Sequence, residues 1–340
     1  MKKISFKDDY SEGAHPEILK TLSKTNLIQT IGYGEDEFSE KAKQLIKSKI
    51  GINNIDIHFV SGGTQANLIV ISSLLKPHQS VIAVNTAHIE VHEAGAIEAT
   101  GHKINTIETE DGKLTPELIQ EVVDYHTDEH MVKPKMVFIS NSTEVGTIYT
   151  KKELTKLSEI CKKNNLYLYI DGARSASALS SEKNDLTLKD ISELTDIFYI
   201  GGTKNGALLG EAIVISNEKL KEDFRFYLKQ KGALLAKGRL LGIQFLTLFK
   251  NNLYFELAER ANHSAQKIAQ ALKNKGYDFL SQPQTNQLFP ILPNKLITEL
   301  HKKYEFYVWK KINETKSVVR IICSWATKKE DVDAFISDLK

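Results

Sequence analysis

Short apolar runs alternate with longer amphipathic segments over the first two thirds of the chain. Residues 151–163 repeat apolar side chains at a helical period, which predicts a helix with one buried face. Pro116, with Thr115 before it as a candidate cap, predicts the start of another helix. Between such segments lie runs rich in β-branched and aromatic residues, which predict strands at 57–60, 81–84, 136–140, 166–170, 197–200 and 212–215.

Strands that alternate with helices predict an α/β fold, with a mostly parallel sheet covered by helices on both faces. After about Gly238 the pattern changes to a long helical stretch, followed by short strands at 287–292 and 318–323 and a last helix at 329–339. We therefore expect an N-terminal arm at 1–25, a large α/β domain at 26–245 and a smaller C-terminal α+β domain at 246–340.

Composition narrows the class of protein. The 340 residues include 45 Lys and Arg against 43 Asp and Glu, a net charge of +2, which argues against a nucleic-acid binder that relies on bulk positive charge. No apolar run reaches the roughly 18 residues that span a bilayer, and Asp8 and Asp9 interrupt any N-terminal signal sequence. The two cysteines lie far apart and form no disulfide framework, so we expect a cytoplasmic protein.

The residues that follow the predicted strands are the candidates for chemistry, because ligands of open α/β sheets bind beyond the carboxyl ends of the strands. The first such segment is SGGTQ at 61–65, which precedes a predicted helix. Its glycines and the free N–H groups of the helix start favour an anion such as phosphate. The alternative is an ordinary turn capped by Thr64. The segment matches neither a P-loop nor a dinucleotide fingerprint.

Two further strand ends carry an acid and a lysine. Asp171 directly follows LYLYI and either forms a local ion pair with Arg174 or holds a protonated ring nitrogen. Lys204, in GGTK, follows DIFYI. Burial lowers the pKa of such a lysine and makes the amine a nucleophile toward aldehydes, although a phosphate-binding or solvated lysine has the same pattern.

An anion-binding turn, an acid and a lysine, in this order, are what pyridoxal phosphate requires. The cofactor phosphate needs a helix N-terminus, its ring nitrogen a carboxylate and its aldehyde a lysine. Lys204 lies 33 positions after Asp171, which leaves room for one helix and one strand. His88 follows the strand at 81–84, where an imidazole would stack on the ring and take part in proton transfer.

His88 and His92 are also a candidate metal pair, since four positions place them on one helical face. Zinc proteases, however, need a glutamate directly after the first histidine or directly before the second. Ile89 and Val91 stand there instead, so we expect no metal site.

Several stretches resemble the threonine aldolase family of pyridoxal-phosphate enzymes, among the beta-eliminating lyases. They are YGEDEF at 33–38, SGGTQAN at 61–67, AHIEVHEAGA at 87–96, YIDGAR at 169–174, GGTKNGALLG at 201–210 and VVRIICSWAT at 318–327. The resemblance implies the aspartate-aminotransferase-like fold of type I, with a seven-stranded sheet. It also implies an activity like that of low-specificity L-threonine aldolase, which cleaves the Cα–Cβ bond of β-hydroxy-α-amino acids such as threonine, allo-threonine or phenylserine to glycine and an aldehyde.

The same resemblance implies roles for single residues. Lys204 would hold the cofactor as a Schiff base, Asp171 would pair with the pyridine nitrogen and His88 would stack on the ring. The phosphate would be held by the backbone of Gly63 and Thr64 and by the hydroxyl of Thr203.

On the substrate side, Arg174 and Arg320 would lie near the phenolic oxygen of the cofactor and the substrate carboxylate. For Arg320 the alternative is a strand residue paired with a surface acid. Asp8 would also contact substrate. Members of the family assemble as homodimers or homotetramers with the site completed by a neighbouring subunit, and Tyr33 would lie across that interface.

The sequence departs from the family on the substrate side. The family usually has a histidine where this chain has Thr143-Glu144, and often Ser-Asp where it has Asp8-Asp9. Candidates for the base that takes the β-hydroxyl proton are therefore His88, which we favour, and Glu93, His126 and Glu144. Two other functions stay open: a β-eliminating lyase on the same scaffold, and a non-catalytic protein that binds another phosphorylated ligand.

Overall fold

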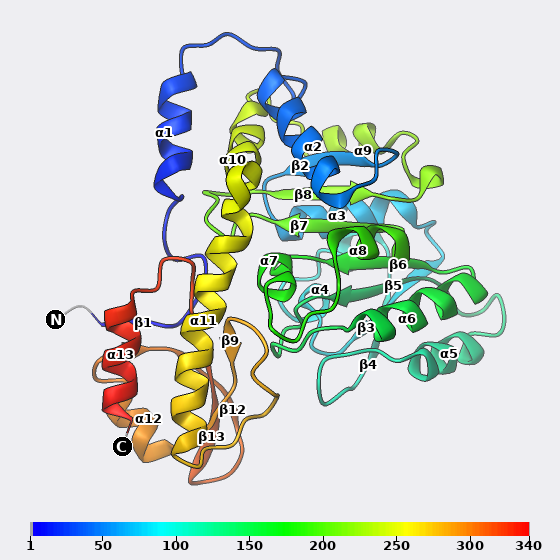
Figure 1. Ribbon diagram of the computed structural model, residues 1–340. Helices are drawn as coiled ribbons and strands as arrows, with labels where there is room; N and C mark the ends of the chain where they lie inside the picture. The colour runs from blue at the N-terminus through cyan, green and yellow to red at the C-terminus, as the bar shows by residue number, and fades with distance from the viewer. Residues whose placement is uncertain (1–2, 340) are drawn as a thin grey trace.

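The computed structural model describes residues 3–339, and its centre is a seven-stranded sheet (Figure 1). In spatial order the strands are β2 (Asp56–Val60), β8 (Glu211–Ile215), β7 (Ile197–Gly201), β6 (Tyr167–Asp171), β5 (Lys133–Ser140), β3 (Gln79–Val84) and β4 (Ile104–Ile107). β8 pairs antiparallel with both β2 and β7, and the other strand pairs of this sheet are parallel. The predicted α/β fold is confirmed, and six of the seven strands fall where the apolar runs predict them.

Helices cover both faces of this sheet. They are α2 (Glu37–Ile50), α3 (Gly63–Leu74), α4 (His88–Val91), α5 (Pro116–Tyr125), α6 (Lys151–Lys163), α7 (Ser175–Leu179), α8 (Leu188–Leu194), α9 (Phe224–Gln230) and α10 (Arg239–Phe249). Figure 1 shows α5, α6 and α8 in front of the sheet and α3 behind it. Thr115 caps α5 as predicted, since its side chain accepts a hydrogen bond from the Leu118 N–H.

The C-terminal part forms a small sheet domain of its own. The long helix α11 (Leu253–Asn274) leads into β9 (Gln287–Leu288), β10 (Ile291–Pro293), α12 (Asn294–Leu300), β11 (Tyr304–Glu305), β12 (Tyr307–Lys311), β13 (Lys316–Ile322) and α13 (Lys329–Asp338). β13 is central, because it pairs with β9, β10 and β12. Near the N-terminus, β1 (Ile4–Ser5) pairs with β11, and α1 (Pro16–Thr25) packs against α10.

The buried apolar residues form two clusters, and α11 runs through both. Leu257 belongs to the cluster around the seven-stranded sheet, and Leu272 belongs to the cluster of the small sheet. The N-terminal segment also divides, since Phe6 packs in the small cluster and Ile18 in the large one. The boundaries at residues 25 and 245 stay a prediction. Within residues 3–339, no helix combines the length and the apolar character needed to cross a membrane.

Candidate active site

The acid and the lysine predicted to act together lie on neighbouring strands. Asp171 is the last residue of β6, and Lys204 lies in the turn that follows β7. Burial and the positive charge of Arg174 hold the pKa of the Lys204 ammonium below its usual value, against the attraction of Asp9 and Asp171. No hydrogen-bond partner reaches Lys204 Nζ from any residue in the described range. This amine is therefore suited to attack an aldehyde.

Three donors orient the buried carboxylate of Asp171. The Tyr199 hydroxyl donates to Oδ1 at 2.5 Å, the Ala173 N–H donates to Oδ1 at 3.0 Å, and Asn67 Nδ2 donates to Oδ2 at 3.2 Å. The alternative of a local ion pair with Arg174 is wrong, because that guanidinium binds Asp9. Within residues 3–339, Oδ2 accepts a single hydrogen bond, at 3.2 Å, so it has room for a further donor such as a protonated ring nitrogen.

A hydrogen-bonded chain links Asp171 to His88, so the structure brings both predicted residues together. Asn67 Nδ2 also donates to Glu93 Oε1 at 2.7 Å, and the same oxygen lies 2.8 Å from His88 Nδ1. Tyr169 fixes the amide of Asn67 by donating to its Oδ1 at 2.7 Å. Sequence reasoning missed Asn67, although it lies one helical turn after Gly63 in the matching segment at 61–67.

Glu144, one of the candidate bases, lies beside His88. Its Oε1 accepts hydrogen bonds from the Ser140 hydroxyl at 2.6 Å and from the His88 N–H at 3.1 Å. Burial raises the pKa of this carboxyl group. Its other oxygen, Oε2, is buried and has no partner among the described residues.

The N-terminus of α3 is open to a ligand. Thr64 is not its cap, as the alternative reading required: Gly62 occupies that position, Thr64 is exposed, and no side chain caps the helix. A Cβ at Gly63 would lie 2.9 Å from the Tyr199 hydroxyl oxygen, so only glycine fits there without a shift. The first N–H groups of this 12-residue helix are therefore available to an anion.

Thr203 takes part in the turn that carries Lys204. Its hydroxyl oxygen accepts a hydrogen bond from the Gly210 N–H at 2.9 Å. The hydroxyl also bonds to Glu211, whose Oε2 accepts from the Gly202 N–H at 2.9 Å. Burial raises the pKa of Glu211 to about 7, although the hydrogen bond from Thr203 and the positive charge of Lys204 both act to lower it. Sequence reasoning missed this acid, because it is the first residue of β8 and does not follow a strand.

Each of the two candidate arginines binds an aspartate of the N-terminal segment. Arg174 holds Asp9 through two hydrogen bonds, Nε to Oδ2 at 2.7 Å and Nη2 to Oδ1 at 3.0 Å. Arg320 contacts Asp8 once, Nη2 to Oδ1 at 3.3 Å. The side chains of Asp8 and Arg320 are only 12% and 14% exposed, so the partner of Arg320 is not a surface acid.

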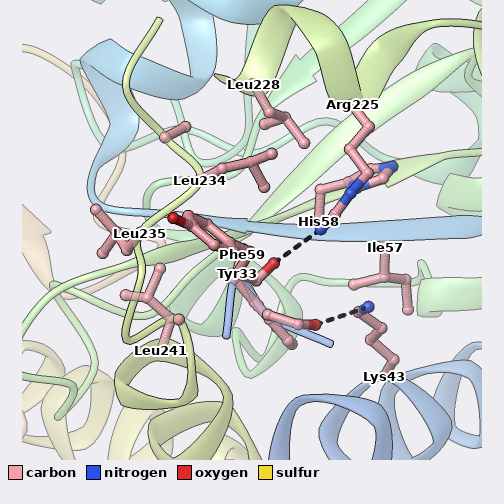
Figure 2. Close-up of a pocket in the computed structure, with 13 residues that line it drawn as sticks. Tyr33, Lys43, Ile57, His58, Phe59, Arg225, Leu228, Leu234, Leu235 and Leu241 are labelled. Carbon is pink, nitrogen blue, oxygen red and sulfur yellow. Dashed lines mark hydrogen bonds between the residues drawn. The ribbon is translucent and has the colours of Figure 1, made fainter. Parts of the chain in front are cut away.

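Tyr33 lies in a different place within this chain. It is half exposed, has a φ of 59°, and lines a pocket with His58, Lys43 and Arg225 (Figure 2). Arg225 Nη2 donates to the Tyr33 carbonyl oxygen at 3.1 Å, and Lys43 Nζ donates to the Gly34 carbonyl oxygen at 3.4 Å. Two cations therefore fix this loop, away from Asp171 and Lys204.

His92 and His126 are the two other histidines that the sequence singles out. His92 is exposed at the end of α4, with its ring 5.5 Å from that of His88. His126 ends α5 and directs Nδ1 at the Val122 carbonyl oxygen of its own helix, at 2.7 Å. Within residues 3–339, no three His, Cys, Asp or Glu side chains are arranged to hold a metal ion.

Sequence comparison with known proteins points to the same family as the site residues do. The profile described as beta-eliminating lyase matches residues 15–294. The low specificity L-threonine aldolase of a Pseudomonas species is 34% identical over 340 residues, with 98% of this chain and 96% of the relative covered; that of Pseudomonas aeruginosa is 32% identical over the same shares.

Solved structures of known enzymes point to the same family and fold. A Leishmania major threonine aldolase superimposes with a TM-score of 0.97 at 48% identity, over 98% of each chain. A mutant of Thermus thermophilus aspartate aminotransferase, at a TM-score of 0.74 and 12% identity over 99% of this chain and 90% of its own, shares the fold. The chain belongs to the beta-eliminating lyase family and, within it, to the threonine aldolases.

Proposed function

We propose that the protein is a pyridoxal-phosphate-dependent lyase that cleaves the Cα–Cβ bond of β-hydroxy-α-amino acids of the threonine, allo-threonine or phenylserine type, giving glycine and an aldehyde. The observation that carries the proposal is the connected site in which the Lys204 amine lies among buried carboxylates and Asp171 is linked to His88. The names of the relatives, low specificity L-threonine aldolase, support it.

The residues present fit pyridoxal phosphate. Lys204 has the lowered pKa that a nucleophilic amine needs, and Asp171 keeps acceptor capacity for a ring nitrogen. The uncapped start of α3, where the Tyr199 hydroxyl leaves no room for a Cβ at Gly63, fits a phosphate, with Thr64 as the next N–H donor. When bound, the cofactor withdraws electrons from the substrate Cα and so allows its bond to Cβ to break.

His88 is the residue we propose to move the proton of the β-hydroxyl group. The Glu93 carboxylate accepts a hydrogen bond from His88 Nδ1. The other ring nitrogen of His88, Nε2, is then left to take the proton from the substrate hydroxyl. Glu144 is the second candidate, because it is buried next to His88 and one of its oxygens is unpartnered among the described residues.

The Thr203 hydroxyl already bonds to the Gly210 N–H and to Glu211. It can contact the cofactor phosphate only if one of these hydrogen bonds breaks.

Arg320 is the better candidate for the substrate carboxylate. Arg174 already makes two hydrogen bonds to Asp9, whereas Arg320 makes one long contact and keeps Nε unpartnered among the described residues. Arg174 then acts beside the cofactor, where its charge keeps the pKa of Lys204 low.

We also propose a homodimer or homotetramer in which Tyr33 completes the site of a neighbouring subunit. Tyr33 is exposed, and its loop is held by Arg225 at the Tyr33 carbonyl oxygen and by Lys43 at that of Gly34. Leu27 and Ile31, which are 92% and 69% exposed, supply apolar surface just before it. A cytoplasmic location fits the two buried, free cysteines.

The test is the site of cofactor attachment combined with the identity of the products. Borohydride reduction of the yellow holoenzyme is expected to add the mass of the cofactor at Lys204 and to bleach the visible absorbance. Lys204→Ala is the control and is expected to gain no such mass. A colourless wild-type protein with no adduct would instead favour the non-catalytic binding protein.

Products separate the two lyases. With threonine, allo-threonine and phenylserine, we expect glycine and the corresponding aldehyde. A keto acid and ammonia in place of glycine would favour the β-eliminating lyase, which is the second candidate because the family profile carries that description.

A further inference from the structure

We infer that Asp8 is an internal competitor for the substrate carboxylate: it occupies Arg320 in the free enzyme, must be displaced by the amino acid, and so sets the affinity for substrate. This inference rests on the proposed function, because it takes Arg320 as the carboxylate-binding residue. It makes Asp8 a specificity-determining residue that weakens binding, where the sequence suggests only a substrate contact.

The position of Asp8 is fixed by the strand pairing of the residues before it. The Phe6 N–H donates to the Glu305 carbonyl oxygen at 2.8 Å, and the Ile322 N–H donates to the Phe6 carbonyl oxygen at 2.8 Å. Phe6 itself is fully buried in the small apolar cluster. The chain therefore leaves the small sheet beside β13, which is the strand that carries Arg320.

The two aspartates bind their arginines in different ways. Asp9 is fully buried, makes two hydrogen bonds with Arg174, and accepts a third from Asn286 Nδ2 at 3.0 Å. Asp8 makes a single contact with Arg320, to Nη2 at 3.3 Å, and also bonds to the Tyr10 hydroxyl. The first pair is a permanent structural contact, whereas the second is weak enough to be exchanged.

Arg320 keeps the donors that a carboxylate needs. Its Nε is buried and has no hydrogen-bond partner within residues 3–339. The rings of Tyr307 and Trp309 lie 4.9 and 5.3 Å from its guanidinium carbon and restrict how it turns. A buried donor without a partner is costly, and a carboxylate bound by two parallel hydrogen bonds would satisfy it.

The N-terminal segment connects Arg320 to the end of the large sheet that carries the site. Arg320 contacts Asp8, and the next residue, Asp9, binds Arg174, which follows Asp171 at the end of β6. A substrate whose amino group reaches Lys204 therefore has its carboxylate near Arg320. There it meets the like charge of Asp8, which competes for the same guanidinium.

Asp8→Asn in the holoenzyme tests this inference. The change keeps the shape of the side chain, removes its charge and loosens its hold on Arg320. We expect the dissociation constant for glycine, measured from the change in visible absorbance on titration, to fall about three- to tenfold. The dissociation constant for ethylamine, an amine without a carboxylate, is expected to stay the same. For threonine, KM is expected to fall while kcat is unchanged.

Glu12→Gln is the matched control, because Glu12 is an exposed acid of the same segment and bonds to Ser324 through Oε1, which glutamine retains. It is expected to change neither dissociation constant. Asp8→Ser is the second variant if Asp8→Asn does not fold. Glycine binding that stays equal or weakens, or ethylamine binding that shifts as much as glycine binding, would overturn the inference. A wild-type holoenzyme that releases no glycine from threonine would overturn the proposed function alone, since the two titrations still decide the role of Asp8.

Discussion

Asn67 is the residue on which the two central carboxylates depend. Its amide donates to both Asp171 and Glu93, and Tyr169 holds the amide in place. Asn67→Ala would leave both carboxylates short of a donor and facing one another. We expect kcat to fall by at least about tenfold, with a shifted absorbance spectrum of the bound cofactor, because a hydrogen bond to a charged group contributes about 1.5–3 kcal/mol.

Asn262 provides the control for that measurement. It is another buried asparagine of a helix, and its Nδ2 donates to the Ser177 carbonyl oxygen at 2.8 Å, in the interior of the protein. Asn262→Ala is expected to lower stability and to leave the cofactor spectrum unchanged. If both variants altered stability alone, Asn67 would be a structural residue without a role in orienting the site.

At this scale, the sequence predicts the reactive groups better than their partners. Asp171, Lys204 and His88 could be singled out because each follows a strand, and strand ends converge. Arg174 was an obvious partner for Asp171 by spacing, yet it binds Asp9, 165 positions away. No local pattern predicts such a contact, because tertiary contacts, among them the pairing of β1 with the small sheet, bring the N-terminal segment to the site.

At the scale of elements, the close contact between the ends of β6 and β7 decides the geometry of the site. A Cβ at Gly172 would overlap the Tyr199 carbonyl oxygen, and one at Gly201 would lie 2.5 Å from the Ala173 carbonyl oxygen. Gly172→Ala would push the two strand ends apart, together with Asp171 and the lysine turn. We expect the free energy of unfolding, measured by urea denaturation, to fall by about 3 kcal/mol, with weaker cofactor binding.

Gly13→Ala is the comparison for this change. Nothing lies within 4 Å of a Cβ at Gly13, and its backbone is not left-handed, so we expect no loss of stability. Equal stability of Gly172→Ala and wild type would show that the strands can separate at little cost and that their contact does not position the site.

The elements themselves follow closely from the apolar pattern where burial is complete. α6 begins and ends where the pattern predicts, and its capping box, Thr150 with Glu153, explains the start. β4 escaped prediction because it is a four-residue edge strand of which only two residues are buried. β4 is a strand because it pairs with β3, and this pairing forms only when the rest of the sheet has folded, so residues 104–107 alone do not reveal it.

At the scale of the whole molecule, Asp9 joins three parts of the chain. It belongs to the N-terminal segment, binds Arg174 at the end of the large sheet, and accepts from Asn286 next to the small sheet. Composition and periodicity predict two lobes, but not that a single buried carboxylate connects them. Asp9→Asn would leave the Arg174 guanidinium buried beside a neutral partner. We expect the free energy of unfolding at neutral pH to fall by about 3–5 kcal/mol, measured by urea denaturation.

The pH dependence of that loss identifies its cause. Burial alone would raise the pKa of Asp9, but Arg174 and Lys204 outweigh it, so the pKa lies below its usual value in the folded protein. The carboxylate therefore stabilises the fold above about pH 4, where aspartate is ionised in the unfolded chain, and this contribution disappears as the pH falls through the lower pKa of the folded state. The difference in the free energy of unfolding between wild type and Asp9→Asn is expected to be constant from pH 8 to about pH 5 and to become smaller below pH 4.

Glu182→Gln, a change at an exposed acid, is the control and is expected to have nearly the stability of wild type at each of these pH values. If the stability difference between wild type and Asp9→Asn stayed the same at acid pH, then the shape of Asp9, and not its charge, would connect the N-terminal segment with the two sheets.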